Sequence, residues 1–199
     1  STKLLVTVQR EGKIFEQEYS IGKPKYAVRE IGEATDTGTF VHFLPDDSIF
    51  TVSEYKYETV ANRIRELSFL NKGIRLTLTD LRDLDEHGQP RTEEFHSQGG
   101  LTEFVTYLDS TRDQLIQTPI YMENEKGTVP VEVAMIYNTS YSENVVSYVN
   151  NINTIEGGTH VSGFRMALTR TLKNYAEKTG ILAKEKIEIS GDDFREGLT

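Results

Sequence analysis

The fold is decided by residues 150–165, NNINTIEGGTHVSGFR, in which the end of a strand, a glycine loop and the start of a long helix follow one another. Gly157 and Gly158 allow the backbone to turn sharply where side chains would clash. We expect the hydroxyl of Thr159 to cap the first free amides of the helix. The helix is long enough to cover a sheet, because its apolar residues share one face: Val161, Phe164, Leu168, Leu172, Tyr175 and Ala176.

Hydrophobic periodicity predicts the remaining elements. Alternating apolar and polar residues indicate strands with one buried face, and apolar residues at three- and four-residue steps indicate helices. The acidic stretch 80–92 predicts a solvated hairpin loop. Residues 120–150 predict an antiparallel set of three strands joined by turns at 124–127 and 138–143. Expected strands are 4–9, 14–19, 38–44, 74–79, 120–122, 129–137, 144–150 and one beginning at 187–189, and expected helices are 57–72, 101–108 and 161–179.

Side chains that cap helices occur at two further places. Thr51 and Glu54 have the spacing of a capping box ahead of the first helix, and Ser53 is an alternative cap. Asp192 and Asp193 predict a helix start near the end of the chain. Because a helix that stops one turn after its cap buries no useful face, we expect this chain to be a fragment of a longer protein.

Composition excludes several classes of protein. A chain of 199 residues with 37% hydrophobic residues is able to bury a core. No apolar run approaches the roughly 20 residues that span a bilayer, and the first residues lack a signal-peptide pattern, so we expect a cytoplasmic protein. The absence of cysteine excludes disulfides, thiol nucleophiles and thiolate metal sites.

Charge is distributed unevenly along the chain. A net charge of -9 argues against a protein that coats nucleic acid over its whole surface. Residues 161–187 nevertheless contain more basic than acidic side chains and carry a net positive charge. Arg165, Arg170 and Lys173 lie on the long helix, where they indicate either a solvated surface or contact with nucleic acid.

Other site patterns are weak or missing. The histidines form no His-x-His or His-x-x-x-His pair, so no metal site is predicted, and we interpret His160 as a packing or capping residue. No Gly-x-Ser-x-Gly elbow of a serine hydrolase is present. The glycines at 157, 158 and 163 are compatible with a phosphate cradle at the helix start. Because neither a Walker motif nor a dinucleotide motif is present, a simple turn is favoured.

Several separate stretches occur together in an order that is typical of one family. They are residues 9–13, residues 37–39 with Phe43 and Pro45, residues 65–71, residues 150–165 and residues 191–198. Over essentially its whole length, the chain resembles the B subunits of DNA gyrase, an ATP-driven type II topoisomerase. The expected architecture is α+β, with two two-layer sandwiches. The resemblance implies that residues 1–116 are the C-terminal part of a GHKL-type ATPase domain, and that residues 117–199 are the first part of a transducer domain similar to ribosomal protein S5.

The resemblance also implies an activity for the parent protein. In this family, ATP binding with Mg²⁺, and hydrolysis aided by a glutamate base, drive dimerisation of the B subunits and close a gate around a DNA segment. The transducer relays that closure to the DNA-cleaving core. The implied cofactors are therefore ATP and Mg²⁺. The implied partners are the gyrase A subunit, in a complex of two A and two B subunits, and duplex DNA, and the implied outcome is negative supercoiling.

Few residues of the family's nucleotide site correspond to positions in this chain. The catalytic glutamate, the magnesium-binding asparagine, the adenine-reading aspartate and the ATP lid correspond to positions before Ser1, and the phosphate-binding lysine to one after Thr199. The resemblance leaves Thr39, near the adenine, and Val41 beside it. We therefore expect no catalytic residue, bound nucleotide or ATP hydrolysis in this chain alone. Arg165 corresponds to an arginine that faces the DNA cavity, and the same helix carries two further candidate DNA contacts, Arg170 and Lys173.

Three alternatives stay open on the sequence. The B subunit of topoisomerase IV, which decatenates DNA, shares most of these motifs. A chaperone or repair ATPase of the GHKL superfamily would act as a nucleotide-operated protein clamp without strand passage, and a following metal-binding cleavage domain would exclude it. The third alternative is a rigid interaction module, which the salt dependence of duplex binding tests.

Overall fold

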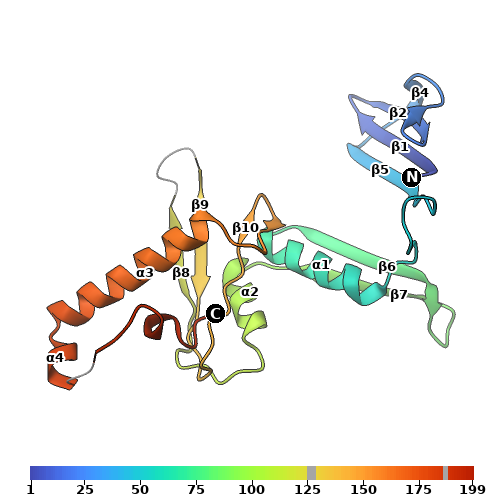
Figure 1. Ribbon diagram of the computed structural model, residues 1–199. Coiled ribbons are helices and arrows are strands. Elements are labelled where there is room, and N and C mark those ends of the chain that lie inside the picture. The colour runs from blue at the N-terminus through green and yellow to red at the C-terminus, as the bar shows by residue number, and fades with distance from the viewer. Residues whose placement is uncertain (125–128, 186–187) are drawn as a thin grey trace. The chain divides into compact units, whose positions relative to one another are not determined.

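The structure, a computed structural model, describes residues 1–124, 129–185 and 188–199 (Figure 1). The described chain forms two compact units, Ser1–Lys56 and Tyr57–Thr199. Sheets and helices are both present and mostly occupy separate stretches of the sequence. The predicted α+β class is therefore confirmed.

The unit Ser1–Lys56 is built on an antiparallel sheet in the order β3-β2-β1-β5, with β4 also paired to β2. Glu11 and Gly12 connect β1 to β2 with φ values of 55° and 76°, the left-handed conformation that tight hairpin turns require. The predicted hairpin and the predicted strand 38–44 are confirmed. The strands are β1 (Lys3–Arg10), β2 (Lys13–Ser20), β3 (Lys23–Pro24), β4 (Arg29–Glu33) and β5 (Gly38–Leu44).

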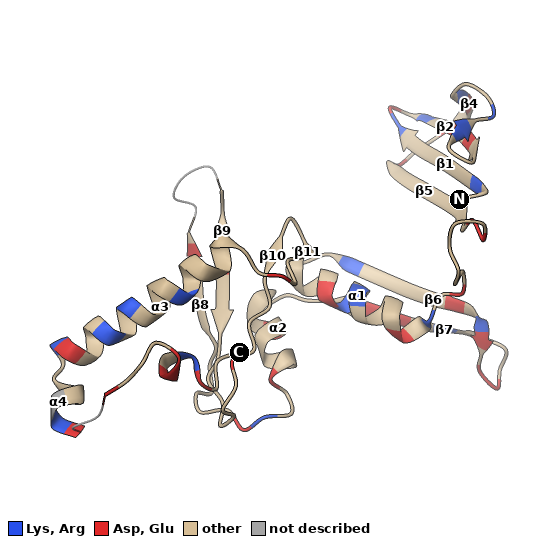
Figure 2. Ribbon diagram, in the orientation of Figure 1, with Lys and Arg blue, Asp and Glu red and all other residues tan. Residues whose placement is uncertain are grey.

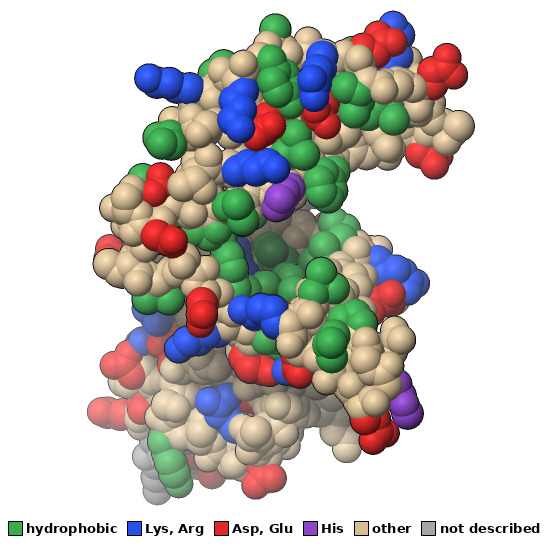
Figure 3. Space-filling model, turned by 90° about the vertical axis from the view of Figure 1, so that its right-hand side faces the viewer, with side chains coloured by type: hydrophobic (Ala, Val, Ile, Leu, Met, Phe, Trp, Pro, Cys, Tyr) green, Lys and Arg blue, Asp and Glu red, His purple; other side chains and the backbone are tan. Residues whose placement is uncertain are grey.

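Hydrophobic side chains of this sheet are largely accessible. Every residue of β5 is exposed, including Phe40, Val41 and Phe43. Figure 3 shows hydrophobic side chains at the surface among acidic and basic ones. The hydrophobic residues of the described chain that are almost completely buried all belong to Tyr57–Thr199. The core that positions the candidate site therefore lies in that second unit.

In the second unit, α1 packs on the hairpin formed by β6 and β7 (Figure 1). Ala61 of α1 is completely buried, and its small side chain permits close approach of the helix to its neighbours. Phe69 of α1 stacks on Phe104 of α2 with ring centroids 5.1 Å apart. Both helices were predicted and are confirmed. The elements are α1 (Tyr57–Leu70), β6 (Arg75–Leu84), β7 (Pro90–His96) and α2 (Leu101–Leu108).

The long helix α3 packs beside β9 in the same unit (Figure 1). Leu168 of α3, Met135 of β9 and Leu198 form a buried apolar cluster. The apolar face predicted for the helix is thus confirmed at its centre. The remaining elements are β8 (Ile120–Asn124), β9 (Val131–Met135), β10 (Tyr148–Val149), β11 (Ile152–Asn153), α3 (Thr159–Lys178), α4 (Ile181–Glu185) and the 3-10 turn η1 (Asp193–Arg195).

Strand predictions fail where pairing depends on distant residues. Much of the predicted loop 80–92 belongs to the β6–β7 ladder, in which Asp80 lies opposite Arg91. Only two residues of the predicted strand 144–150 are in a strand, and they form the small hairpin β10–β11 instead of joining β9.

Two further predictions fall partly on residues that the structure does not describe. These are the turn at 124–127, of which residues 125–127 are not described, and the strand beginning at Ile187. The residues that follow Ile187, 188–190, form no strand.

The helix-cap predictions are wrong. The first helix begins at Tyr57, beyond Ser53 and the proposed capping box. Gly158 occupies the cap position of α3, so Thr159 is the first helical residue and makes no cap. The predicted final helix is the single 3-10 turn η1, which Asp192 precedes without a side-chain cap.

The last residues of the chain lie along the end of β9. Ile136 and Thr199 exchange two backbone hydrogen bonds of 2.9 and 3.0 Å, and Leu198 is 1% exposed. Gly197 makes this return possible with a φ of 70°. A Cβ atom at this position would overlap the carbonyl oxygen of Asn138, so only glycine fits.

A buried polar network links α2 to this return. Asp109, the C-cap residue of α2, is 0% exposed. Its Oδ1 accepts hydrogen bonds from Asn138 Nδ2 at 2.7 Å and from the Thr199 hydroxyl at 3.0 Å, and Arg112 lies 3.5 Å away. One carboxylate oxygen is therefore the shared acceptor of this network.

Replacing Asp109 by Ala should destabilise the chain by about 2–4 kcal/mol, because two buried donors lose their acceptor. Urea unfolding of the chain measures the change. Asp113→Ala, at an exposed position four residues away, is the control and should leave the unfolding midpoint unchanged. Equal midpoints for both variants would contradict the role of the network.

A second polar contact organises the start of α2. Glu103 accepts hydrogen bonds from the Ser97 hydroxyl at 2.5 Å and the Gly99 amide at 2.8 Å. The hydrogen bond from Ser97, reinforced by those from backbone amides, holds the pKa of Glu103 below its usual value of 4.5. This arrangement resembles a capping box, in which a carboxylate in the first turn satisfies a free amide before the helix.

Because its folded-state pKa is lowered, ionised Glu103 adds stability at neutral pH, and this contribution declines as the pH falls below 4.5 through the lower folded value. Glu103→Gln should therefore lower the midpoint temperature of unfolding at pH 7. The difference in midpoint between this variant and the wild type should become smaller in acid. Thermal unfolding across pH measures both effects. Glu177→Gln serves as a control for simple charge loss, and a gap that is independent of pH would refute the assignment.

Candidate nucleic-acid interface

The chain enters α3 through two consecutive tight turns. Asn150 and Asn151 join β10 to β11 with φ values of 49° and 65°, a left-handed conformation that asparagine adopts more readily than most residues. Gly157 then has a φ of 76°, and Gly158 a φ of 153°. A Cβ atom on Gly158 would lie 2.8 Å from the His160 ring. The glycines therefore serve the turn and the close approach of His160.

His160 connects the first turn of α3 to the preceding hairpin. Its Nε2 lies 3.0 Å from the Thr154 hydroxyl, which in turn lies 2.5 Å from the Ser147 hydroxyl. His160 is exposed and makes a hydrogen bond, so its interpretation as a packing or capping residue stays a prediction. Across the described ranges, no group of three or more His, Cys, Asp or Glu side chains is arranged to hold a metal ion.

The β10–β11 hairpin is also fixed to α1. Asn151 donates from Nδ2 to Asn71 Oδ1 at 2.9 Å, and its carbonyl accepts from Arg63 at 2.7 Å. The Tyr148 hydroxyl donates to Glu66. Partial burial, with the nearby Glu66 carboxylate, raises the pKa of Tyr148, so this hydroxyl stays protonated at neutral pH. These contacts fix where the turn before α3 begins.

Basic residues lie along α3 (Figure 2), and their spacing distributes them around the helix. At about 100° per residue, Lys173 lies about 80° and Arg170 about 140° around the helix from Arg165. Arg170 and Lys173 are exposed, and neither forms an ion pair with another residue that the structure describes. Arg165, in contrast, is partly enclosed and paired. The structure therefore separates Arg165 from the other two.

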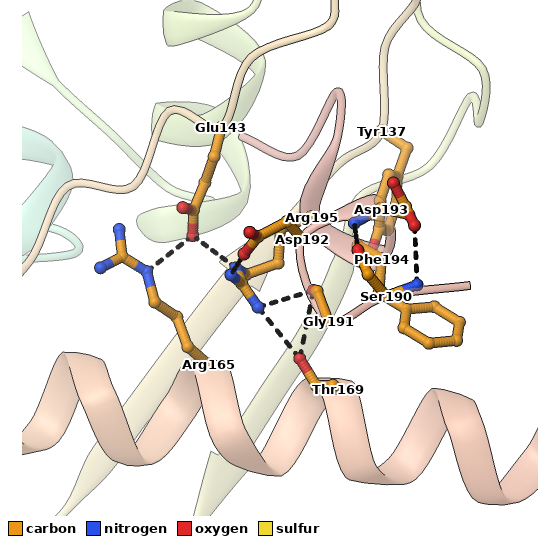
Figure 4. A network of polar contacts seen from close by, with 10 residues as sticks. All are labelled: Tyr137, Glu143, Arg165, Thr169, Ser190, Gly191, Asp192, Asp193, Phe194 and Arg195. Atoms are coloured by element: carbon orange, nitrogen blue, oxygen red, sulfur yellow. Dashed lines mark hydrogen bonds and ion pairs between the residues drawn. The ribbon is translucent and has the colours of Figure 1, made fainter. Parts of the chain in front are cut away.

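Arg165 belongs to an arginine–glutamate network of Arg165, Glu143 and Arg195 (Figure 4). Arg165 Nε donates to Glu143 Oε1 at 2.8 Å. The same oxygen lies 3.6 Å from Arg195 Nε, which is too far for a hydrogen bond. The Arg165 side chain is 42% exposed and that of Arg195 is 16% exposed. One carboxylate thus lies between an accessible and an enclosed guanidinium.

Arg195 is held in place by groups other than Glu143. One Nη atom donates to the Gly191 carbonyl at 2.7 Å and to the Thr169 hydroxyl of α3 at 3.0 Å. The other Nη atom pairs with Asp192. These bonds join the turn at residues 191–195 to the middle of α3 (Figure 4).

Adjacent groups fix the same turn from its other side. The Ser190 amide donates to Asp193 Oδ2 at 2.7 Å, and this bond together with the Ser190 hydroxyl lowers the pKa of Asp193. The Tyr137 hydroxyl donates to the Phe194 carbonyl at 2.7 Å, and burial raises the pKa of Tyr137. The turn that holds Arg195 is therefore tied to both α3 and the segment after β9.

The predicted nucleotide contacts Thr39 and Val41 lie in the other compact unit, on β5. Two residues apart on one strand, they share a face of the sheet, and they lie opposite Val8 and Val6 of β1. Both are exposed, Val41 by 52%. They offer one hydroxyl and one apolar surface, which suits the edge of a base, and neither side chain carries a charge for phosphate or Mg²⁺. Their assignment to a nucleotide site stays a prediction.

The sequence alone gives little indication that Glu143 and Arg195 belong to a functional site. Glu143 lies in a predicted turn, 22 residues before its partner Arg165, and no helical or strand spacing connects the two. Arg195 lies within the conspicuous stretch 191–198, but its partners come from α3 and from Glu143. Only the packing of the chain end beside β9 brings these groups together.

No helix among the described residues has the length and apolar character needed to cross a bilayer.

Comparison with known proteins gives consistent matches over the whole chain. The family described as DNA gyrase B matches residues 100–199. The DNA gyrase B subunit of Cytophaga hutchinsonii is 69% identical over 199 residues, which is 100% of this chain and 42% of that protein. That of Halalkalibacterium halodurans is 46% identical over 200 residues, covering 100% of this chain and 31% of that protein. The chain therefore spans less than half of the length of these relatives.

Solved structures agree in fold. The 43K ATPase domain of Thermus thermophilus gyrase B, in complex with an aminocoumarin, matches with a TM-score of 0.81 and 33% identity, over 100% of this chain and 53% of that one. The B subunit of the DNA gyrase from Myxococcus xanthus matches with a TM-score of 0.81 and 23% identity, over 100% of this chain and 55% of that one. The second match bears on the fold alone.

Proposed function

The chain belongs to the DNA gyrase B family, and from that premise we propose that it serves the ATPase and transducer region of a type II topoisomerase. The parent enzyme couples ATP binding and hydrolysis to DNA strand passage and negative supercoiling. Identity of 69% to a DNA gyrase B subunit over all 199 residues is the observation that carries the proposal. Residues 1–116 serve the ATPase domain and residues 117–199 the transducer.

The nucleotide role of the chain is partial. Thr39 and Val41 lie at the adenine edge of the ATP site, and ATP and Mg²⁺ are cofactors of the parent enzyme. The residues that activate water and hold the metal belong to parts of the relatives that this chain does not cover. The partners are duplex DNA, the gyrase A subunit and a second B subunit, and the compartment is the cytoplasm.

The DNA-facing role falls to α3. Arg165 is partly exposed, and Figure 4 shows its terminal nitrogen atoms directed away from Glu143. A guanidinium in this state is available to a phosphate oxygen. Arg170 and Lys173 add positive charge to exposed sides of the same helix. Arg165 contacts the transported DNA segment without reading its sequence, and Arg170 and Lys173 attract that segment from other sides of the helix.

Topoisomerase IV is the second candidate, since its B subunit shares the same motifs. The curated relatives at 69%, 68% and 65% identity are all DNA gyrase B subunits, which favours gyrase. Supercoiling of relaxed DNA by the reconstituted enzyme separates the two activities, because a topoisomerase IV would decatenate without introducing negative supercoils.

The chain alone should hydrolyse no ATP, because Thr39 and Val41 provide neither a general base nor a carboxylate for the metal ion. Phosphate release from highly purified chain measures this, with the full-length protein as the positive control. ATP turnover that persists through further purification steps would refute the proposal that the catalytic residues lie outside this chain.

Arg165→Gln in the full-length enzyme should reduce coupled supercoiling about tenfold, as expected for loss of a charge-assisted phosphate contact. Nucleotide affinity should change little, because Arg165 and the predicted nucleotide contacts belong to different compact units. Supercoiling assays and nucleotide titrations measure the two effects. Lys178→Gln removes the same charge from the same helix and is the matched control. Equal loss of both functions would count against the DNA-facing role.

A further inference from the structure

Glu143 has one hydrogen-bonded arginine and a second arginine within reach. Its Oε1 accepts from Arg165 Nε at 2.8 Å and lies 3.6 Å from Arg195 Nε. Arg195 Nε is buried and has no hydrogen-bond partner within the described part of the chain. A buried N–H without an acceptor is unfavourable, so this atom is an unsatisfied donor beside a charged acceptor.

A small movement of the carboxylate changes its partner. Moving Oε1 by about 0.7 Å toward Arg195 brings the pair to ordinary hydrogen-bond distance. Arg195 itself stays fixed, because the Gly191 carbonyl, the Thr169 hydroxyl and Asp192 hold its other nitrogen atoms. Glu143 therefore has two alternative arginine partners, of which the enclosed one is stationary.

We propose that Glu143 is an exchangeable counter-ion for Arg165, which pairs with Arg165 when DNA is absent and moves onto Arg195 Nε when a DNA phosphate takes Arg165. This inference rests on the proposed DNA contact at Arg165. It adds the residue that controls that contact and the chemistry that displaces it, which is a phosphodiester oxygen. No bond is made or broken in the exchange except hydrogen bonds and ion pairs.

Competition follows from the charges. A phosphate that approaches the terminal nitrogen atoms of Arg165 is repelled by the negative charge of Glu143 as long as the carboxylate stays on Nε of the same guanidinium. Partly exposed ion pairs are weak, so the negative charge of a phosphate bound at the two terminal nitrogen atoms is able to drive the Glu143 carboxylate off Nε by repulsion. Arg195 lowers the cost of displacement, because the released carboxylate keeps a positive partner.

The exchange also changes the contacts of a turn that is connected to the core. Arg195 follows Phe194, whose carbonyl is bound by Tyr137, and precedes the buried Leu198. A further hydrogen bond on Arg195 would hold the turn at 191–195 more firmly when DNA is bound. The segment beside β9 thereby responds to a ligand on α3.

The first test is duplex DNA binding by the full-length protein over a range of salt concentrations. Glu143→Gln should raise the affinity about three- to tenfold at low salt, because a competing charge is lost. The gain should disappear in the Arg165→Gln background. Glu177→Gln is the matched control, because it removes one negative charge about three helical turns beyond Arg165 on α3. It should give a smaller gain in affinity, and that gain should be the same in the Arg165→Gln background.

The second test concerns the acceptor of the released carboxylate. Arg195→Lys should weaken DNA binding, since Lys has no nitrogen at the Nε position and Glu143 then stays on Arg165. The loss should vanish in the Glu143→Gln background. A loss that persists there would assign Arg195 a structural role and overturn the exchange.

The outcomes separate the inference from the proposed function. If Arg165→Gln leaves DNA binding unchanged, the proposed DNA contact fails. If Arg165→Gln weakens binding but Glu143→Gln leaves it unchanged or weakens it, the contact stands and the counter-ion role is overturned. Circular dichroism checks that the variants fold. Glu143→Asp, whose shorter side chain withdraws the charge from both arginines, should also raise the affinity and repeats the test if the Gln variant does not fold.

Discussion

Burial of Leu198 between β9 and α3 is the constraint on which the second unit depends. Its side chain packs with Met135 and Leu168, and its neighbour Thr199 bonds to the backbone of Ile136. Without this contact, the apolar face of α3 would lose a main buried partner, at a cost of several kcal/mol for the exposed side chains. The position of α3 is therefore set by residues that follow it in sequence, as well as by the sheet.

The same contact determines the geometry of the arginine–glutamate network. Gly197 permits the turn that brings Leu198 into the core, and Arg195 precedes it by two residues. Once the turn is in place, Arg195 lies against Thr169 on the next helical turn after Arg165. Glu143 then lies between two positive charges from separate segments. The polar site is thus a consequence of apolar packing, and it needs no local sequence motif.

The sequence predicted those elements whose signal is local. The helix beginning at Tyr57 and the strand 38–44 follow from periodicity and are correct. The pairing of residues 80–84 and the short hairpin at 148–153 depend on partners or backbone angles that periodicity does not encode. The same distinction holds in the site. Arg165 was identified through family resemblance, whereas Glu143 has no signal near it in the chain, and the roles of Thr39, Val41, Arg170 and Lys173 stay predictions.

Electrostatics explain how the paired arginine of α3 differs from the exposed basic residues of the same helix. The chain carries a net charge of -9, so most of its surface repels DNA. The attraction to DNA comes mainly from the basic residues of α3. Exposed Arg170 and Lys173 contribute to that attraction at a distance that salt screens. Arg165 differs because Glu143 neutralises it at close range. Under the proposed DNA contact, a phosphate must come within contact distance before Arg165 contributes fully, so we expect this position to respond more to a DNA segment that is held in place than to one that passes by.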